Sequence, residues 1–341
     1  MVDDATPEVQ ANEAPKKAPV RRRRPAAPPP GFHHRHVVVD VPASTANLGA
    51  GFDTLALALD LRDRIEVEVV DAPGLELSVS GEGAGALPAG RDNRFVVALE
   101  TGLRWALGEV PLEVGFRIAM HNAIPLGRGL GSSAAATVAG LVAANALTGN
   151  GLDQRRLLTL SIEIEGHPDN AAAALLGGFV VIAVVDGRPE TIRFDVPKDL
   201  GVVLFVPDVQ MATTEMRAAL PHDVPHRDAV FNLGRVALTV AGFASGRYDT
   251  LRAGTEDRLH EPYRAVAYPA LPRLLAAARA AGALGACLSG SGSTVLAFGD
   301  SAPSLKAIGS AFIDVAAELD LTGSVRALSP RNAGAVVIEA E

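Results

Sequence analysis

Cysteine is nearly absent from this chain of 341 residues, in which Cys287 is the single example. One cysteine cannot form an internal disulfide or a thiolate metal cluster, so we expect a reducing compartment, the cytoplasm. The small neighbours of Cys287, Gly285 and Ala286, predict a buried core residue rather than a reactive thiol. Long apolar runs are absent too, and none approaches the roughly 20 residues of a membrane-spanning helix. We therefore do not expect a protein embedded in a membrane.

Positive charge is scarce outside the N-terminus. The formal net charge is −8, and residues 1–36 hold seven Lys and Arg against four Asp and Glu, which leaves 24 against 35 in residues 37–341. An acidic body argues against a nucleic-acid surface, since affinity for nucleic acid depends on neutralising phosphates. Residues 1–36 are rich in Pro and Ala, include four arginines at 21–24, and lack the apolar stretch of a secretory signal. We predict that they form a disordered tail.

Apolar residues recur along the chain with the periods of both strands and helices. The two kinds of segment are mixed without the regular strand–helix–strand alternation of a doubly wound sheet, so we predict a two-layer α+β protein. Expected strands cover residues 37–41, 65–70, 112–120, 179–185, 202–206, 295–298 and 335–338, and expected helices cover residues 93–107, 133–147, 153–165, 229–244, 271–281 and 305–319.

The strongest functional signal is a glycine-rich segment before the expected helix at 133–147. Three glycines at alternate positions let main-chain N–H groups turn around an anion without a clash from a Cβ atom. The N-terminus of the helix adds unpaired N–H groups and the positive end of its dipole. A serine there is the expected N-cap, and its hydroxyl can donate to phosphate or bind a hard cation. The segment reads Pro125, Leu126, Gly127, Arg128, Gly129, Leu130, Gly131, Ser132, Ser133 and Ala134.

Other phosphate-binding motifs fit this segment less well. A Walker A loop needs a lysine directly after a glycine, and none of Lys16, Lys17, Lys198 and Lys306 follows one. Residues 129–134 weakly match a dinucleotide-binding fingerprint, which predicts a second strand that ends in an acid about 20 residues on. A helix is expected there instead. Taken alone, the segment also fits a glycine-rich turn without function.

Three segments together resemble the motifs of the GHMP small-molecule kinases, the superfamily that includes galactokinase, homoserine kinase and mevalonate kinase. They are the segment at 125–136, an earlier one at 42–53 (PASTANLGAGFD) and a later one at 288–294 (LSGSGST). The resemblance implies the GHMP kinase fold, in which a two-layer N-terminal half similar to the second domain of ribosomal protein S5 packs on a ferredoxin-like α+β C-terminal half. We expect the ATP-binding half at residues 37–190 and the second half at residues 191–341.

Within the superfamily, these segments most resemble the homoserine kinase family. The first segment departs from that family's pattern at Thr45 and Ala50, and the third departs at Ser293, while residues 165–170 (EGHPDN) match a further motif. The resemblance implies ATP-dependent phosphorylation of the side-chain hydroxyl of L-homoserine, with ATP and Mg²⁺ as cofactors and a homodimer as the assembly. The alternatives are a superfamily kinase acting on a mevalonate-like or sugar substrate, and a regulator that binds nucleotide without catalysis.

The resemblance also implies which residues of the active site bind the nucleotide and which bind the metal ion. The amides of the glycine-rich segment and Asn93 would bind the nucleotide. Ser133 and an acid on the helix at 153–165 would hold Mg²⁺, which favours oxygen ligands. Glu165 is the first choice for that acid, and Glu163 is the second.

An acceptor end is implied as well. Arg217 and Arg264 would clamp the carboxylate of an amino-acid acceptor, a task that suits the guanidinium fork, while Asp53 would accept from its ammonium group. Two routes are open for the hydroxyl proton, with either Asp169 as base or direct transfer to phosphate, and we favour direct transfer with Asn170 at the substrate. No histidine has the partner spacing of a metal motif. The other residues expected at the acceptor are Asn47, His167, Thr213 and Gly290.

Overall fold

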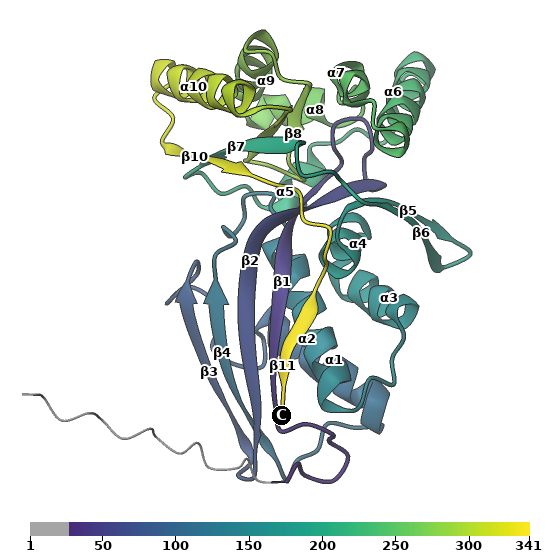
Figure 1. The fold of residues 1–341 in the computed structure, drawn as a ribbon, viewed down its shortest axis with the longest axis vertical. Coiled ribbons are helices and arrows are strands. Elements are labelled where there is room, and N and C mark those ends of the chain that lie inside the picture. The colour runs from purple at the N-terminus through teal and green to yellow at the C-terminus, as the bar shows by residue number, and fades with distance from the viewer. Residues whose placement is uncertain (1–26) are drawn as a thin grey trace, which may run out of the picture.

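The computed structural model describes residues 27–341, which form two packed units (Figure 1). Most of the predicted tail, residues 1–26, lies outside the described residues. From Phe32 onward, however, the chain contacts the larger unit, contrary to our expectation of disorder up to residue 36. Phe32 is buried against the ring of Phe116, and Arg35 pairs with Asp71 at 2.8 Å. The apolar Phe32 therefore anchors the chain before the first strand begins.

The larger unit is built on a seven-stranded sheet with the order β11-β1-β2-β4-β3, to which β5 is added on β2 and β6 on β5. All pairings are antiparallel except that of β3 with β4. Apolar residues alternate with charged ones in the second half of β2, as expected for a sheet with one solvated face. The strands are β1 (His36–Ala46), β2 (Leu55–Val70), β3 (Gly74–Gly81), β4 (Gly115–Asn122), β5 (Phe179–Val185), β6 (Arg188–Phe194) and β11 (Val336–Ala340).

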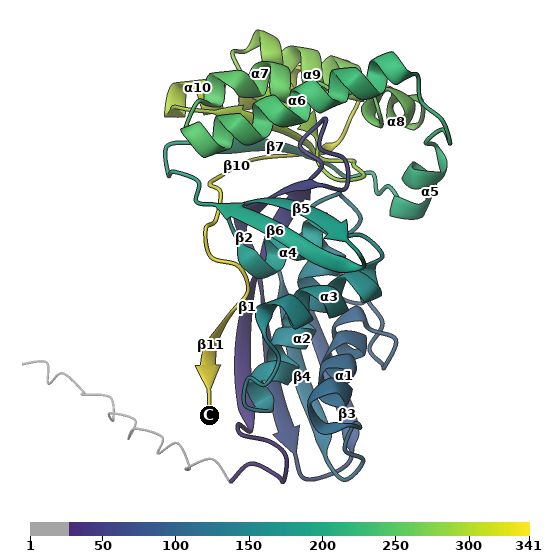
Figure 2. The ribbon, with the colours of Figure 1, turned by 90° about the vertical axis from the view of Figure 1, so that its right-hand side faces the viewer.

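Four helices cover one face of this sheet (Figure 2). The central one is α2, made mostly of Ala, Val and Leu, and it packs on both α1 and β1. Its small residues allow close approach, because a side chain at Gly102 of α1 would overlap Ala144. Each fully buried Val or Leu here contributes about 1.5–3 kcal/mol. The four helices are α1 (Arg94–Leu107), α2 (Ser132–Leu147), α3 (Gln154–Glu165) and α4 (Asp169–Leu176).

The smaller unit has a four-stranded antiparallel sheet with the order β10-β7-β9-β8. Figure 1 shows this sheet across the upper end of the long strands. Its strands are β7 (Gly201–Pro207), β8 (Gly285–Leu288), β9 (Val295–Gly299) and β10 (Gly323–Leu328), and its helices are α5 (Thr213–Ala218), α6 (His226–Ser245), α7 (Leu251–Gly254), α8 (Glu261–Ala267), α9 (Leu271–Ala280) and α10 (Ala302–Glu318), with a 3₁₀ turn at Tyr248–Thr250. No helix in the described part of the chain has the length and apolar character to cross a bilayer.

The α+β prediction is confirmed, with several differences in the elements. Residues 43–46, expected as loop because they are small, continue β1 by pairing with residues 56–59 of β2. Strands β3, β6, β8 and β10 and helices α4, α5, α7 and α8 were not predicted, because they are short or carry polar residues on both faces. The division expected between residues 190 and 191 falls inside β6, and β11 returns from the second unit to pair with β1.

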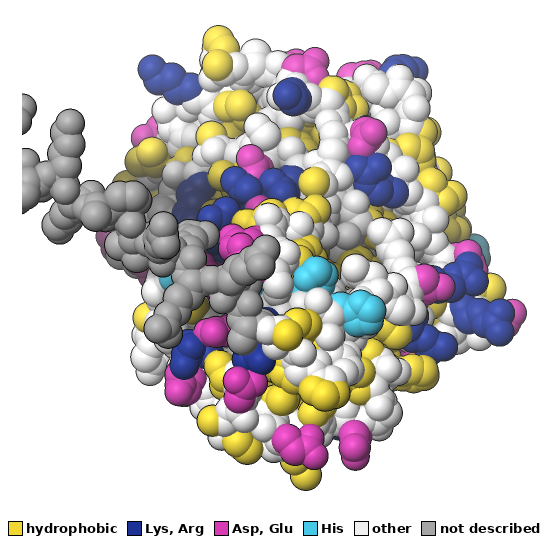
Figure 3. Space-filling view, turned by 60° about the horizontal axis from the view of Figure 1, so that its bottom comes forward, with side chains coloured by type: hydrophobic (Ala, Val, Ile, Leu, Met, Phe, Trp, Pro, Cys, Tyr) yellow, Lys and Arg dark blue, Asp and Glu magenta, His cyan; other side chains and the backbone are white. Residues whose placement is uncertain are grey.

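The solvated face of the larger sheet carries charges of both signs. Arg117 on β4 pairs with Glu68 at 2.6 Å and with Glu76 at 2.9 Å, and each partner lies on a neighbouring strand. In the view from the lower end, Lys and Arg side chains lie interspersed with Asp and Glu where grey atoms do not cover the surface (Figure 3). Such exposed pairs contribute little to stability.

Candidate active site

A cavity of about 120 Å³ lies where the two units meet. Its walls come from the ends of elements rather than from their middles, as is common for sites held by a rigid scaffold. The loop after β1, the glycine-rich loop, the α3–α4 connection, α5, α8 and the turn between β8 and β9 each contribute to it. All eight residues predicted around the acceptor line this one cavity: Asn47, Asp53, His167, Asn170, Thr213, Arg217, Arg264 and Gly290.

The glycine-rich loop forms one wall of the cavity. Gly127, Gly129 and Gly131 have φ angles of 62°, 74° and 72°, which fall in the left-handed region that side chains with a Cβ rarely adopt. A Cβ on Gly129 would overlap the carbonyl oxygen of Ser289, and one on Gly131 would overlap the hydroxyl of Ser44. The glycines therefore both set the turn and allow strand β1 and the turn after β8 to pack directly on it.

The loop ends at the N-terminus of α2, where the predicted serine cap is wrong. Gly131 occupies the N-cap position, and no side chain accepts from the first N–H groups of the helix. The hydroxyl of Ser133 donates instead to Glu165. The first turn of α2 consequently presents main-chain donors and the positive end of the dipole to the cavity, as an anion site requires.

Glu165 stands opposite this helix terminus. Its Oε1 accepts from the hydroxyl of Ser133 at 3.0 Å and from that of Thr137 at 2.6 Å, and Arg94 Nε lies 3.7 Å away. Its side chain is only 4% exposed and lines the cavity with Ser133, whereas Glu163 is exposed and does not line it. The sequence reasoning missed Thr137, although it lies one helical turn after Ser133 on the same face.

An ion pair dominates the other end of the cavity. Arg217 donates to both oxygens of Asp53, at 2.9 and 2.6 Å, and this bidentate contact raises the pKa of the guanidinium. We predicted that these side chains would bind opposite ends of a zwitterion, and in the structure they bind each other. A zwitterion carries the same two charges, so its carboxylate and ammonium can each replace one member of the pair.

Arg264 is the second cation at this end, and it is 1% exposed. Its Nη1 donates to the carbonyl of Gly290 at 2.8 Å and contacts His260 Nδ1 at 3.1 Å. Burial lowers the pKa of Arg264 to about 10, and the nearby charge of Arg217 acts in the same direction. The ring of Phe52 lies 5.4 Å from the guanidinium carbon of Arg217 and 5.5 Å from that of Arg264, so it spaces the two cations.

Two residues predicted at the acceptor, Asn47 and Asn170, connect segments of the site by hydrogen bonds. Asn47 Nδ2 donates to Gly290, and its Oδ1 accepts from the amide of Asp53. Asn170 Nδ2 donates to the hydroxyl and carbonyl of Ser44 at 2.9 and 3.2 Å. Both asparagines are at least nine-tenths buried, and both line the cavity.

The α3–α4 connection contributes Asp169 and His167. Asp169 is buried, and its Oδ1 accepts from the amide of Asn170 at 2.7 Å. The same oxygen lies 3.3 Å from His167 Nδ1, and this contact raises the pKa of the imidazole. Oδ1 of Asp169 therefore already has two neighbours, the amide of Asn170 and the ring of His167.

A second cavity, of about 240 Å³, adjoins the first at Ser132 and Ser133. Leu126 and Asn93 line it, but Asn93 caps α1 by accepting from Phe95 and donating to Pro88. The side chain of Arg128 donates to carbonyls at 126, 207 and 208, so it lines neither cavity. Pro125 does not line them either.

The sequence reasoning missed two polar residues of the second cavity. Asn122 is 7% exposed, and its Oδ1 has no hydrogen-bond partner among the described residues. Asp63 accepts from the amides of Ala123 and Ile124, and burial raises its pKa to about 6. Only the position of Asn122 at the end of β4, just before the glycine-rich loop, could have indicated it, whereas Asp63 lies in the interior of β2.

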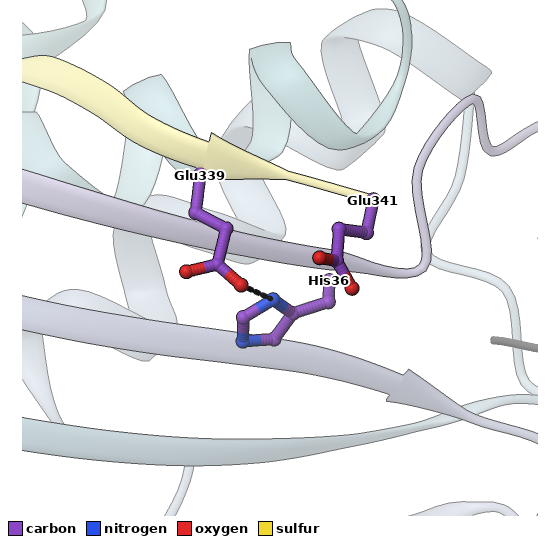
Figure 4. Close-up of side chains that lie close together, drawn as sticks. All are labelled: His36, Glu339 and Glu341. Carbon is purple, nitrogen blue, oxygen red and sulfur yellow. Dashed lines mark ion pairs between the residues drawn. The ribbon is translucent and has the colours of Figure 1, made fainter. Parts of the chain in front are cut away.

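Cys287 is a buried core residue, as predicted, and one histidine lies beside two acids. Cys287 is buried, and burial raises the pKa of its thiol well above the usual value. Among residues 27–341, one group of three His, Cys, Asp or Glu side chains lies close enough together to hold a metal ion. It consists of His36, Glu339 and Glu341 (Figure 4). The imidazole lies 3.7 Å from Glu339, and both acids are exposed on the sheet edge. Exposed charge of this kind is ordinary at such an edge, and we assign no metal site to it.

Comparison with known proteins identifies the class. Residues 93–178 match the model for the N-terminal domain of GHMP kinases, and residues 239–317 match that for the C-terminal domain. A homoserine kinase of Corynebacterium efficiens is 47% identical over 77% of this chain and 85% of its own length. A homoserine kinase of Moorella thermoacetica is 41% identical over 88% of this chain and 99% of its own.

A solved structure agrees with these relatives. The crystal structure of homoserine kinase from Cytophaga hutchinsonii superposes with a TM-score of 0.81 at 32% identity, covering 90% of this chain and 98% of that one. The fold and the two matched domains are those of the GHMP kinases, which confirms the predicted fold class. Within that class, the chain belongs to the homoserine kinase family.

Proposed function

We propose that this protein transfers the γ-phosphoryl group of ATP to the side-chain hydroxyl of L-homoserine, which yields O-phospho-L-homoserine for threonine biosynthesis. One observation carries the proposal. The same cavity joins a glycine-rich loop at a helix N-terminus to two arginines, the half-buried Arg217 and the buried Arg264, with the carboxylate of Asp53 nearby. Phosphoryl transfer needs little more than this positioning and charge neutralisation.

The donor phosphates belong at the glycine-rich loop. The main-chain N–H groups from Gly127 to Ser133 and the uncapped first turn of α2 provide donors without any lysine. Because the loop is packed against Ser44 and Ser289, these donors are held in place before the nucleotide binds. Preorganised donors of this kind stabilise developing charge at low reorganisation cost.

Ser133 and Glu165 fit a magnesium ion. A hydroxyl and a carboxylate oxygen lie 3.0 Å apart on the cavity wall, and Mg²⁺ prefers oxygen ligands completed by phosphate and water. The ion supplies charge neutralisation between the phosphates when it is bound. Thr137 donates to the same oxygen, Oε1 of Glu165, and so fixes the carboxylate beside Ser133.

The base of the nucleotide belongs in the second cavity. That cavity adjoins the loop, and its apolar lining includes Leu87, Met120 and Leu126. The unpaired Oδ1 of Asn122 and the carboxylate of Asp63 offer acceptors to the exocyclic amino group of adenine. Guanine carries a carbonyl oxygen at the corresponding position, so it would leave these acceptors unpaired.

The nucleotide assignment has a direct test. Asn122→Ala should raise the KM for ATP about 10-fold and leave the KM for GTP nearly unchanged, since one hydrogen bond is worth about 0.5–1.5 kcal/mol and a buried unpaired group costs more. Steady-state kinetics with both nucleotides measure this. An equal rise in both KM values would show that Asn122 does not read the base.

At the acceptor end, Arg217 and Arg264 bind the carboxylate of homoserine, and Asp53 binds its ammonium group. Thr213, whose hydroxyl lies 3.1 Å from that of Ser291, and His167 complete the wall. A neutral sugar has no carboxylate for the two arginines, and mevalonate has a carboxylate but no ammonium group for Asp53, so both alternative substrates are less suited to this site. A regulator without catalysis would not need Glu165 beside the phosphate loop.

We assign the hydroxyl proton to the transferred phosphate rather than to a side chain. Asp169, the candidate base, is tied by its Oδ1 to the amide of Asn170 and to His167. We also carry forward a homodimer and a cytoplasmic location as parts of this proposal.

An ADP-release assay tests the proposal. The enzyme would be offered homoserine, mevalonate, galactose and shikimate with ATP and Mg²⁺. We expect turnover with homoserine and none comparable with the other three. Absence of turnover at millimolar homoserine would refute the substrate assignment.

A further inference from the structure

The turn before α8 carries a histidine with no local structural task. His260 occupies the N-cap position of α8, but its side chain does not cap the helix. Asp257 does so instead, because its carboxylate accepts from the amides of Leu259, His260 and Glu261. The ring of His260 is fully buried, and its centroid lies 5.3 Å from that of the tilted ring of Phe52. The imidazole must therefore be explained by its other contacts.

The ring nitrogens of His260 join two parts of the acceptor site. Nε2 lies 2.8 Å from the carbonyl of Gly49, in the loop between Asn47 and Asp53. Since a carbonyl can only accept, Nε2 must carry the proton of a neutral ring, and Nδ1 is then an acceptor. Nδ1 lies 3.1 Å from Nη1 of Arg264, which is always a donor.

This arrangement requires the neutral imidazole. A protonated ring would turn Nδ1 into a donor facing the guanidinium, so the contact with Arg264 would become repulsive. Burial lowers the pKa of His260, and the positive charge of Arg264 acts in the same direction, against the raising effect of Asp257. The ring can therefore serve as a fixed acceptor at neutral pH.

We propose that His260, as the Nε2–H tautomer, is a positioning residue that aims the guanidinium of Arg264 at the carboxylate of the acceptor and ties its orientation to the loop that carries Asp53. The proposal rests on the proposed function, since it assumes that Arg264 binds the acceptor. His260 itself does not touch the substrate, because it does not line the cavity. Its effect is exerted through Arg264.

Two substitutions separate the two ring nitrogens. The side-chain amide of Asn reaches about as far as Nδ1, and that of Gln reaches about as far as Nε2. His260→Asn should keep an acceptor for Arg264 and lose the bond to Gly49, whereas His260→Gln should keep a donor for Gly49 and lose the acceptor. The two variants are close in size and polarity, so each serves as the other's control.

The experiment is steady-state kinetics of the full chain with homoserine and ATP varied separately. His260→Gln should raise the KM for homoserine about 10-fold, as expected for one lost hydrogen bond to a charged group, with the KM for ATP within 2-fold. His260→Asn should keep both values within 3-fold. In an Arg264→Lys background, His260→Gln should add less than 2-fold, because coupled residues are not additive.

Several outcomes would overturn the proposal. An unchanged KM for homoserine in His260→Gln, an equal rise in the KM for ATP, or full additivity with Arg264→Lys would each show that His260 is a core residue only. If the Gln variant does not fold, the Asn variant decides, and a 10-fold rise in its KM for homoserine would refute the idea. No homoserine turnover by the native chain would instead refute the proposed function.

Discussion

The two ends of the cavity are lined by different kinds of chemical group. The donor end consists of main-chain amides, three left-handed glycines and small side chains, with Glu165 as its acid. The acceptor end holds buried or half-buried charged side chains, and Arg264 is the largest fully buried side chain of the described residues. A triphosphate can be held by backbone donors, because its charge is spread over many oxygens. A zwitterionic amino acid needs separate charges at fixed positions.

This difference determines how each end should respond to mutation. Backbone donors cannot be deleted by changing a side chain, so the donor end is sensitive to shape and to its single acid. The acceptor end depends on guanidinium and carboxylate groups that are costly to bury, so changes there should alter affinity and pH dependence. Substitutions at each end can test whether the two ends respond in these different ways.

The largest effect should come from Glu165→Gln. Loss of the carboxylate that we assign to Mg²⁺ should lower kcat on the order of 1000-fold, since a bound metal supplies several kcal/mol of charge stabilisation. Glu163→Gln, on the exposed side of the same helix, is the control and should stay within 3-fold. Single-turnover kinetics over a range of Mg²⁺ concentrations measure both. A Glu165→Gln variant with native kcat would refute the assignment of this carboxylate to Mg²⁺.

Gly129→Ala should be the most damaging change to the loop's shape. Gly127→Ala should lower the free energy of unfolding by about 1–2 kcal/mol, which is the cost of the left-handed φ alone. No clash is added, because the nearest neighbour, Gln210, would lie 3.5 Å from the new Cβ. In Gly129→Ala the Cβ also overlaps Ser289, which should add about 1–3 kcal/mol. Urea unfolding measures both free energies. Equal losses in the two variants would mean that the packing of the β8–β9 turn does not constrain the loop.

At the acceptor end, Arg264→Lys should raise the KM for homoserine 10- to 100-fold. Lysine keeps the charge but cannot form the bidentate contact, and hydrogen bonds to charged groups are worth about 1.5–3 kcal/mol. The KM for ATP should not change. Arg258→Lys, at an exposed pair with Asp228, is the matched control. Equal effects on both substrates would contradict the separation of the two ends.

The smallest effect concerns Glu261, which is 6% exposed and accepts from the amide of Leu288 at 2.7 Å. Burial raises its pKa to about 8 from an ordinary value of 4.5. Between these values the folded chain holds a proton that the unfolded chain has lost, so the native stability contributed here falls as pH rises. From pH 6 to pH 7, the native protein should lose about 1 kcal/mol relative to Glu261→Gln, whose amide does not titrate.

Urea unfolding of both proteins at several pH values checks this prediction. Below about pH 4.5 the carboxyl is protonated in both states, so the difference should become constant. Parallel stability curves from pH 5 to pH 8 would show that Glu261 titrates normally, and the acceptor end would then tolerate more ionised groups than the structure indicates.

The sequence was informative where local chemistry decides the structure. Alternate glycines before an Ala-rich helix were sufficient to predict the glycine turn at residues 127–131. The helix expected from residue 153 is found there, because the carboxylate of Asp153 accepts from Arg156 N and caps it. Together with the motif order, these local features also indicated the family. The serine cap of α2 was predicted wrongly, since Ser133 turns to a partner 32 residues away.

The sequence by itself determined the α+β class, the glycine turn and the residue types at the site, because turns, caps and periodicity depend on neighbours in the chain. Only the tertiary structure decided which charged groups are paired. Asp53 and Arg217 are 164 residues apart, and Asn47 and Gly290 are 243 apart, so no local pattern could indicate that they meet. The tautomer of His260 and the unpaired oxygen of Asn122 also follow from packing, since burial and partners from distant segments set what each atom can donate or accept.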